Sequence, residues 1–296
     1  MSELARRVAF AVVAAPAAIA LIYLGGLPLA VLLAVVAALG AWELYRMAHN
    51  AGIDALDGVG IPLAALVPLL VHAHYLRLFT VPFAVMAVLP IALLAVAIFA
   101  RGVAGKPLAS VAVTLFGVMY VGTLGFGYAL RYFPYASGRH PVGFDGVDPA
   151  AGTAVVALPV LLTWASDTGA YFAGRALGKR KLIPSVSPGK TVAGAIGGLL
   201  LSIVVCWAYT RWVLLPLSSL TMGIGGAILF GAVVSVAAQL GDLAESLLKR
   251  DVGVKDSSHI IPGHGGVLDR FDSLFFVLPV AWLLLLHGRL LRVVVA

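Results

Sequence analysis

Residues 81–100 read VPFAVMAVLPIALLAVAIFA, a run of twenty residues without a single charged side chain. About 20 apolar residues in a helix cross the hydrocarbon core of a bilayer. Backbone that is exposed to lipid must satisfy its own hydrogen bonds, so such a run is expected to form a helix and not an open strand. The stretch therefore predicts a transmembrane helix.

Further runs of similar length and almost no charge lie on both sides of it. They cover 8–24, 27–42, 59–75, 109–130, 152–174, 191–212, 220–240 and 271–287. The chain is 61% hydrophobic and 11% charged, and its mean hydropathy is +1.05. A soluble domain has roughly half apolar residues and about a quarter charged ones. The sequence therefore predicts an all-α, polytopic integral membrane protein with about nine transmembrane helices.

Lysine and arginine predict the orientation of these helices, because cytoplasmic loops are enriched in both. With a cytoplasmic N-terminus, fourteen of the twenty lysines and arginines fall on the cytoplasmic side and six on the other. This indicates an odd number of spans and a C-terminus outside. A cleaved signal peptide is the alternative for the first span, which follows Arg6 and Arg7. No polar cleavage region follows it, and this favours a retained helix.

The net charge of +7 would suggest nucleic acid as a partner if the protein were soluble. In a membrane protein the excess of positive charge follows from the topology and from attraction to anionic lipid head groups. No nucleic-acid motif is present in the chain. The expected partner is the lipid bilayer, and no nucleic acid.

The two halves of the chain differ in polar content. Residues 1–150 have few polar residues within the spans, and we interpret them as N-terminal scaffold helices. In this half, Glu43 and Arg46 lie about one helical turn apart, and a simple pair between them is the interpretation. Residues 151–296 carry the polar motifs, and we interpret them as the catalytic region.

Asp167 lies near the cytoplasmic end of an apolar span, where an ionised carboxylate is costly unless it faces a wet cavity or a cation. It shares one helical face with Tyr171 and Arg175, and pairing with Arg175 is the structural alternative. A neighbouring face of small residues allows close approach of helices and makes a homodimer one expectation. That face consists of Ser166, Ala170, Gly174 and Gly178.

The stretch SVSPGKT, residues 185–191, resembles the end of a phosphate-binding P-loop, but the match fails because Pro184 stands where the motif needs glycine. Two hydroxyls, Lys190 and backbone amides at a helix start still make a good anion site. Capping of a helix by Ser187, with Pro188 at the first helical position, is the alternative interpretation.

Six of the thirteen acidic residues lie between positions 242 and 272. A polar stripe on the eighth span contains Gln239, Asp242, Ser246 and Lys249, and such a stripe cannot face lipid. Beyond the next loop, Asp269 and Asp272 lie one turn apart at the start of the last span. Opposing carboxylates with lysine and arginine between them suit a divalent cation that holds a polyphosphate. The charge distribution therefore predicts a reaction of anionic substrates at one cytoplasmic face of the membrane.

The segment PGHGGVLDRFD, residues 262–272, together with the basic residues before it, resembles the signature of the phosphatidate cytidylyltransferase family, also called CDP-diglyceride synthases. The upstream segment SDTGAYFAGRALGKRKLIPSVSPGKT resembles a second block of that family. Ala193 departs from the polar residue expected after KTV, which affects a peripheral contact only. The resemblance implies transfer of a cytidylyl group from CTP to phosphatidic acid, giving CDP-diacylglycerol and pyrophosphate, with Mg²⁺ and a possible second cation as cofactors.

The resemblance also implies roles for individual residues. The implied catalytic residues are Asp242, Lys249, Arg250, Asp269 and Asp272, of which Asp242, Asp269 and Asp272 are the metal ligands. The implied substrate-binding residues are Asp167, Ser187, Lys190, Thr191, Ser246, Lys255, Asp256, His264 and Arg270, with Tyr171 and Gln239 as weaker candidates. We expect the protein in the cell (cytoplasmic) membrane, with its active site facing the cytoplasm.

Two other classes of function compete with this hypothesis. A CTP-dependent polyprenol or lipid kinase would transfer the γ-phosphoryl group instead of the cytidylyl group. A membrane transporter would use polar stripes to line a substrate path. Transporter sites usually lie near the bilayer midplane between internal repeats, whereas these polar residues gather at one membrane face and no repeat is evident. The distribution therefore favours an enzyme.

Overall fold

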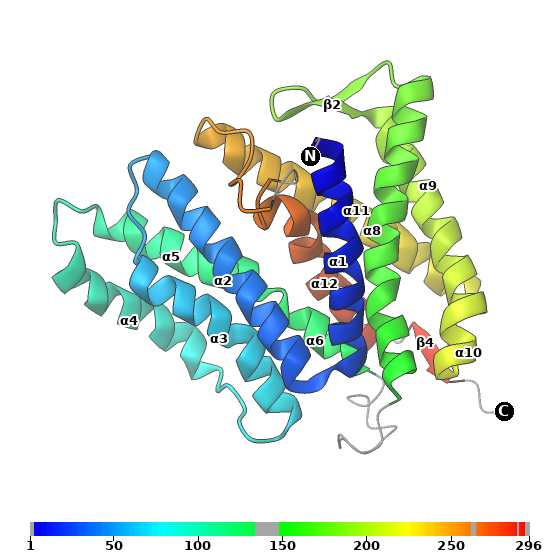
Figure 1. The fold of residues 1–296 in the computed structure, drawn as a ribbon, viewed down its shortest axis with the longest axis horizontal. Coiled ribbons are helices and arrows are strands. Elements are labelled where there is room, and N and C mark those ends of the chain that lie inside the picture. Colours follow the sequence, from blue (N-terminus) through cyan, green and yellow to red (C-terminus); the bar gives the residue numbers. More distant parts are fainter. Residues whose placement is uncertain (1–2, 134–147, 262–264, 289, 294–296) are drawn as a thin grey trace. The chain divides into compact units, whose positions relative to one another are not determined.

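The computed structural model describes residues 3–133, 148–261, 265–288 and 290–293. Helices dominate this part of the chain (Figure 1). The helices before residue 134 are α1 (Glu3–Leu24), α2 (Gly26–Asn50), α3 (Asp57–Tyr75), α4 (Ala84–Ala100), α5 (Pro107–Gly122) and α6 (Gly125–Arg131). Those after residue 147 are α8 (Pro149–Leu177), α9 (Val192–Tyr209), the π-helix η2 (Thr210–Leu214), α10 (Leu215–Ser218), α11 (Ile224–Asp251) and α12 (Leu268–His287).

Seven helices in the described ranges are long and apolar enough to cross a membrane. The protein is therefore an all-α, multi-pass membrane protein. Each of the nine predicted spans overlaps an apolar helix, and the two that are not among these seven overlap α1 and α4. The 17 residues of α4 rise about 25 Å at 1.5 Å per residue, somewhat less than a ~30 Å hydrocarbon core. By length the described residues support seven of the nine predicted spans, and the count of nine stays a prediction.

The chain divides into two compact units. Unit 1 contains Met1–Tyr128 and Leu248–Phe271, and unit 2 contains Ala129–Leu247 and Asp272–Ala296. The loop that carries most of the sequence signature therefore belongs to the same unit as the N-terminal helices. The division describes packing and does not test function. The scaffold role of residues 1–150 and the catalytic role of residues 151–296 therefore stay predictions.

In unit 1, α2 packs against α3 and α5 around the fully buried Tyr45. The ring needs glycine on both sides, since a Cβ at Gly60 or Gly117 would lie within 2.5 Å of the tyrosine side chain. The Tyr45 hydroxyl donates to the Thr114 carbonyl at 2.8 Å, and the Thr114 hydroxyl accepts from the backbone amide of Leu56 at 2.8 Å. These contacts fix α2 within the unit.

In unit 2, α8 and α9 pack closely through small residues. A Cβ at Gly169 would lie 2.6 Å from the Gly197 carbonyl oxygen, and a Cβ at Gly198 would lie 2.5 Å from the Ser166 carbonyl oxygen. A Cβ at Gly174, on the predicted small-residue face, would lie 3.0 Å from the Thr191 side-chain hydroxyl. That face is used within one chain, so it gives no support to a homodimer.

Two small antiparallel sheets complete unit 2. Strand β1 (Lys181–Ile183) pairs with β2 (Ser187–Thr191), and β3 (Leu220–Met222) pairs with β4 (Leu291–Val293). The alternative interpretation of Ser187 as a helix cap is wrong, because Ser187 and Pro188 lie in β2. Helix α9 begins at Val192, and the Thr191 side chain caps it by accepting from the Gly194 amide at 3.0 Å.

Candidate active site

Unit 2 contains a pocket of 680 Å³ among α8, α9, α11 and the β1–β2 hairpin. Its walls combine glycine and alanine with ionisable and polar side chains. Of the predicted site residues, the pocket gathers Asp167, Tyr171, Lys190, Thr191, Gln239 and Asp242. Arg175 and Lys181 also line it, and sequence reasoning had not given Lys181 a role.

Two motifs that are far apart in the sequence meet in this pocket, the SVSPGKT stretch and the polar stripe of α11. Lys190 Nζ lies 2.8 Å from Asp242 Oδ2, and both side chains are partly exposed, at 25% and 36%. The Ser246 hydroxyl donates to the other Asp242 oxygen at 3.4 Å. A partly exposed lysine next to a partly exposed carboxylate offers a positive partner for phosphate and a negative partner for a cation.

Asp272 adjoins Asp242 within the same unit. A Cβ at Gly241 would lie 2.7 Å from the Asp272 carbonyl oxygen, so α11 and the start of α12 are in backbone contact there. The carboxylates of Asp167, Asp242 and Asp272 are close enough to repel one another. A bound cation is one way to relieve such repulsion, and carboxylate oxygens are the ligands that Mg²⁺ prefers.

The structure does not hold these carboxylates in a preformed metal geometry. Within the residues described, no group of three or more His, Cys, Asp or Glu side chains is arranged to hold a metal ion. The carboxylate oxygens are of the type that Mg²⁺ prefers, but their arrangement is not that of a metal site. The predicted metal site therefore stays a prediction.

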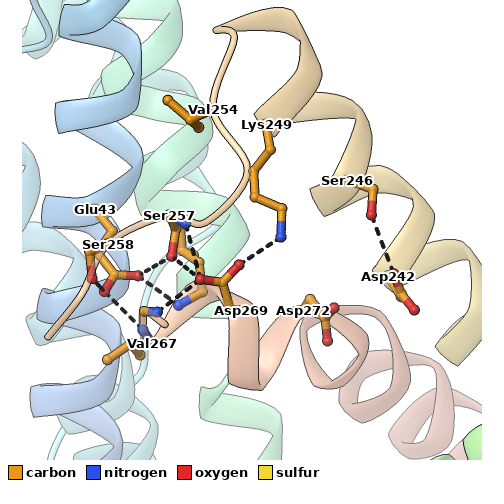
Figure 2. Close-up of polar contacts among 12 residues, drawn as sticks. Glu43, Asp242, Ser246, Lys249, Val254, Ser257, Ser258, Val267, Asp269 and Asp272 are labelled. Atoms are coloured by element: carbon orange, nitrogen blue, oxygen red, sulfur yellow. Dashed lines mark hydrogen bonds and ion pairs between the residues drawn. The ribbon is translucent and has the colours of Figure 1, made fainter. Parts of the chain in front are cut away.

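Asp269 lies in unit 1 and is already engaged there (Figure 2). Its Oδ1 lies 2.6 Å from Lys249 Nζ, and its Oδ2 accepts from the Ser257 amide, the Ser257 hydroxyl and the Gly266 amide at 2.8–3.0 Å. Only 5% of the Asp269 side chain and 12% of the Lys249 side chain are exposed. Asp269 is therefore held in a buried ion pair with Lys249, which is a structural alternative to its predicted role as a metal ligand.

Sequence reasoning missed the role of Glu43. Its carboxylate is fully buried and accepts four hydrogen bonds from residues 257–268, whereas Arg46, its expected partner, lies over the ring of Trp42 at 5.3 Å. The available signal was an acid placed in the long apolar helix α2.

The remaining predicted residues lie in several places. Arg250 is exposed and donates to the Val254 carbonyl at 3.4 Å, and Lys255 and Arg270 are exposed as well. Asp256 lines a second pocket of 410 Å³ in unit 1, together with Arg46 and His259. Ser187 lies in β2 and is not among the residues that line the 680 Å³ pocket. His264 lies outside the described residues.

In a multi-pass membrane protein, this pocket of carboxylates and lysine suits the binding of phosphates and of a divalent cation. The family model for the cytidylyltransferase family matches residues 5–287, and the chain belongs to this family.

Several curated relatives are similar to the chain. A phosphatidate cytidylyltransferase of Haemophilus influenzae is 49% identical over 136 residues, which are 45% of this chain and 46% of the relative. One of Staphylococcus haemolyticus is 41% identical over 172 residues, 58% of this chain and 59% of the relative. One of Bacillus subtilis is 47% identical over 125 residues, 42% and 45% of the two chains. The chain thus spans about half the length of the curated relatives it matches.

Proposed function

We propose that the protein is a phosphatidate cytidylyltransferase. It would transfer the cytidylyl group of CTP to phosphatidic acid and release pyrophosphate, giving CDP-diacylglycerol. The observation that carries this proposal is the ion pair of Lys190 and Asp242 in a pocket that Asp167 also lines, in a chain of the cytidylyltransferase family. The names of the curated relatives support the lipid substrate.

The reaction needs little acid–base chemistry from the protein. A phosphate oxygen of the lipid attacks the α-phosphorus of CTP, and the bond from that phosphorus to the oxygen bridging to the β-phosphorus breaks. The attacking phosphate has a second pKa near 6, so it is largely ionised at neutral pH. The barrier comes from bringing two anions together, and the protein must neutralise and align them.

The residues of unit 2 suit this task. Lys190 would bind a phosphate oxygen of CTP, with Lys181 and Arg175 as further positive charges on the pocket wall. Asp242 and Asp272 would hold Mg²⁺, and Asp269, the third ligand that the family resemblance implies, belongs to unit 1. When bound, Mg²⁺ would offset negative charge on the phosphates and on the leaving pyrophosphate.

We also propose the orientation of the protein. The bias of lysine and arginine supports a cytoplasmic N-terminus, nine crossings that include α1 and α4, and a site that faces the cytoplasm at the cell membrane. CTP is a charged cytoplasmic nucleotide, so this orientation gives it direct access.

Product analysis tests the proposed function. Purified protein in lipid nanodiscs is given phosphatidic acid, Mg²⁺ and CTP labelled at either the α- or the γ-phosphorus. The proposal expects the α-label in the lipid product and release of pyrophosphate. Transfer of the γ-label would identify a lipid kinase and overturn the proposal, and so would absence of transfer from either label.

A further inference from the structure

Glu43 of α2 accepts hydrogen bonds from the opposite half of the sequence, from the signature loop before α12 and from the first residue of α12 (Figure 2). Its Oε1 accepts from the Val267 amide at 2.8 Å and the Ser258 hydroxyl at 2.6 Å. Its Oε2 accepts from the Leu268 amide at 2.7 Å and the Ser257 hydroxyl at 2.9 Å. All of these residues lie in unit 1.

The two backbone contacts explain why a buried carboxylate is tolerated at this position. Helix α12 begins at Leu268, and the first amides of a helix have no partner within it. Glu43 accepts from Leu268 and from the amide just before it, so it caps α12 from a different helix. A carboxylate that accepts several charge-assisted hydrogen bonds can be buried, whereas an unpaired one cannot.

The space around Glu43 is closely filled. A Cβ at Gly266 would lie 2.6 Å from both Glu43 carboxylate oxygens and 2.0 Å from the Ser257 hydroxyl. The Ser257 hydroxyl is also 3.0 Å from Asp269 Oδ2, so it lies between the two carboxylates. The position of Glu43 is therefore linked through one hydroxyl to the Lys249–Asp269 pair.

We infer that Glu43 is a positioning residue for cytidylyl transfer. Its contacts hold Ser257, Ser258 and the first turn of α12, and through them Asp269, in the arrangement that the reaction requires. This inference rests on the proposed function. It assigns a role in the reaction to a residue of the N-terminal half, which the sequence analysis interprets as scaffold helices.

The test compares Glu43→Gln with Tyr45→Phe in nanodiscs. Glutamine keeps the size of the side chain but places an NH₂ group where one oxygen accepts two hydrogen bonds. Tyr45→Phe removes a different buried hydrogen bond from the same helix, and Tyr45 has no contact with the loop among its described bonds. It therefore controls for a general loss of stability. The measurements are melting temperature, kcat, the KM for CTP, and hydrogen exchange of residues 257–268.

We expect Glu43→Gln to speed hydrogen exchange at Val267 and Leu268 and to lower the kcat of the folded protein about 10- to 100-fold, because small misplacements of reacting groups have effects of that size. The KM for CTP should change much less. Tyr45→Phe should lower the melting temperature and leave both kcat and exchange of the loop near the wild-type values.

Two results would overturn the inference: unchanged exchange of the loop in Glu43→Gln, or a kcat reduced no more than in Tyr45→Phe. If Glu43→Gln does not fold, Ser258→Ala keeps three of the four bonds, and unchanged exchange and kcat in that variant would equally overturn it. Wild-type protein without cytidylyl transfer would instead refute the proposed function. The exchange measurement needs no turnover and would still decide whether Glu43 holds the loop.

Discussion

Lys190 of β2 and Asp242 of α11 form an ion pair, with 2.8 Å between Nζ and Oδ2. The pair joins two motifs that are far apart in the sequence, the SVSPGKT stretch and the polar stripe of α11. Both side chains are partly exposed, and exposed ion pairs contribute little to stability, about 0–1 kcal/mol. The pair is therefore better explained by a need for both charges in the pocket than by a need for stability.

Replacing Lys190 with glutamine tests the positive charge. We expect Lys190→Gln to lower kcat/KM for CTP about 10- to 100-fold, because a charge-assisted contact to phosphate is lost. The melting temperature should hardly move. Lys179→Gln is the matched control, since Lys179 is exposed nearby and does not line the pocket. The measurement is kcat/KM for CTP in both variants. Equal values in the two would show that Lys190 does not bind CTP.

Asp242→Asn tests the predicted metal site. If Asp242 binds Mg²⁺, the variant should lose activity about 100-fold or more, and the residual activity should need a higher Mg²⁺ concentration. Asp251→Asn, at the exposed end of α11, is the control. The measurement is the Mg²⁺ titration of turnover. An unshifted titration in Asp242→Asn would argue against a metal ligand at this position.

The buried pair of Lys249 and Asp269 predicts coupled effects on stability. Removal of one partner leaves the other as an uncompensated charge, and this typically costs about 3–5 kcal/mol. Lys249→Gln and Asp269→Asn should each lower the melting temperature strongly, and the double variant should be destabilised by less than the sum of the two. Additive losses would mean that the two charges do not depend on each other.

The Asp269→Asn preparation also separates the two readings of that residue. A metal ligand predicts a shifted Mg²⁺ titration in addition to the lower melting temperature. A purely structural pair with Lys249 predicts the lower melting temperature alone, with the Mg²⁺ dependence of the residual activity unchanged.

Close packing of α8 and α9 predicts that Gly169→Ala is destabilising. The added methyl group would meet the Gly197 carbonyl oxygen at 2.6 Å, and overpacking of this kind costs about 1–3 kcal/mol. Gly225→Ala in α11 is the control, because nothing lies within 4 Å of its Cβ and alanine is the better helix former. Thermal unfolding in detergent compares the two, and a neutral Gly169→Ala would contradict this close packing.

The proposed orientation predicts labelling by membrane-impermeant thiol reagents. In a Cys206→Ala background, cysteines at Lys179 and Asp251 should react only when the reagent reaches the cytoplasmic side. A cysteine at Leu78, which is 74% exposed and lies in a predicted outer loop, should react from outside in intact cells. Reaction of Lys179→Cys or Asp251→Cys from outside would refute the orientation.

The sequence by itself determined the membrane class, the approximate positions of the helices and the family signature. These follow from local properties: an apolar run long enough for a bilayer must be a helix, and the start of α12 next to Asp269 and Asp272 was predicted within a few residues. Lys190, Asp242 and Asp167 were also recognisable as site candidates, because charge is rare in such a chain and needs a reason.

Only the tertiary structure decided which of these charges meet. It paired Lys190 with Asp242 and Lys249 with Asp269, and it assigned the signature loop to the unit of the N-terminal helices. It also made Thr191 the cap of α9 and Glu43 the cap of α12. The physical reason is that the first amides of a helix can donate to a side chain nearby in the sequence or to a distant buried one. Helical periodicity fixes the face of a residue on its own helix, and only packing decides which side chain of another helix faces it.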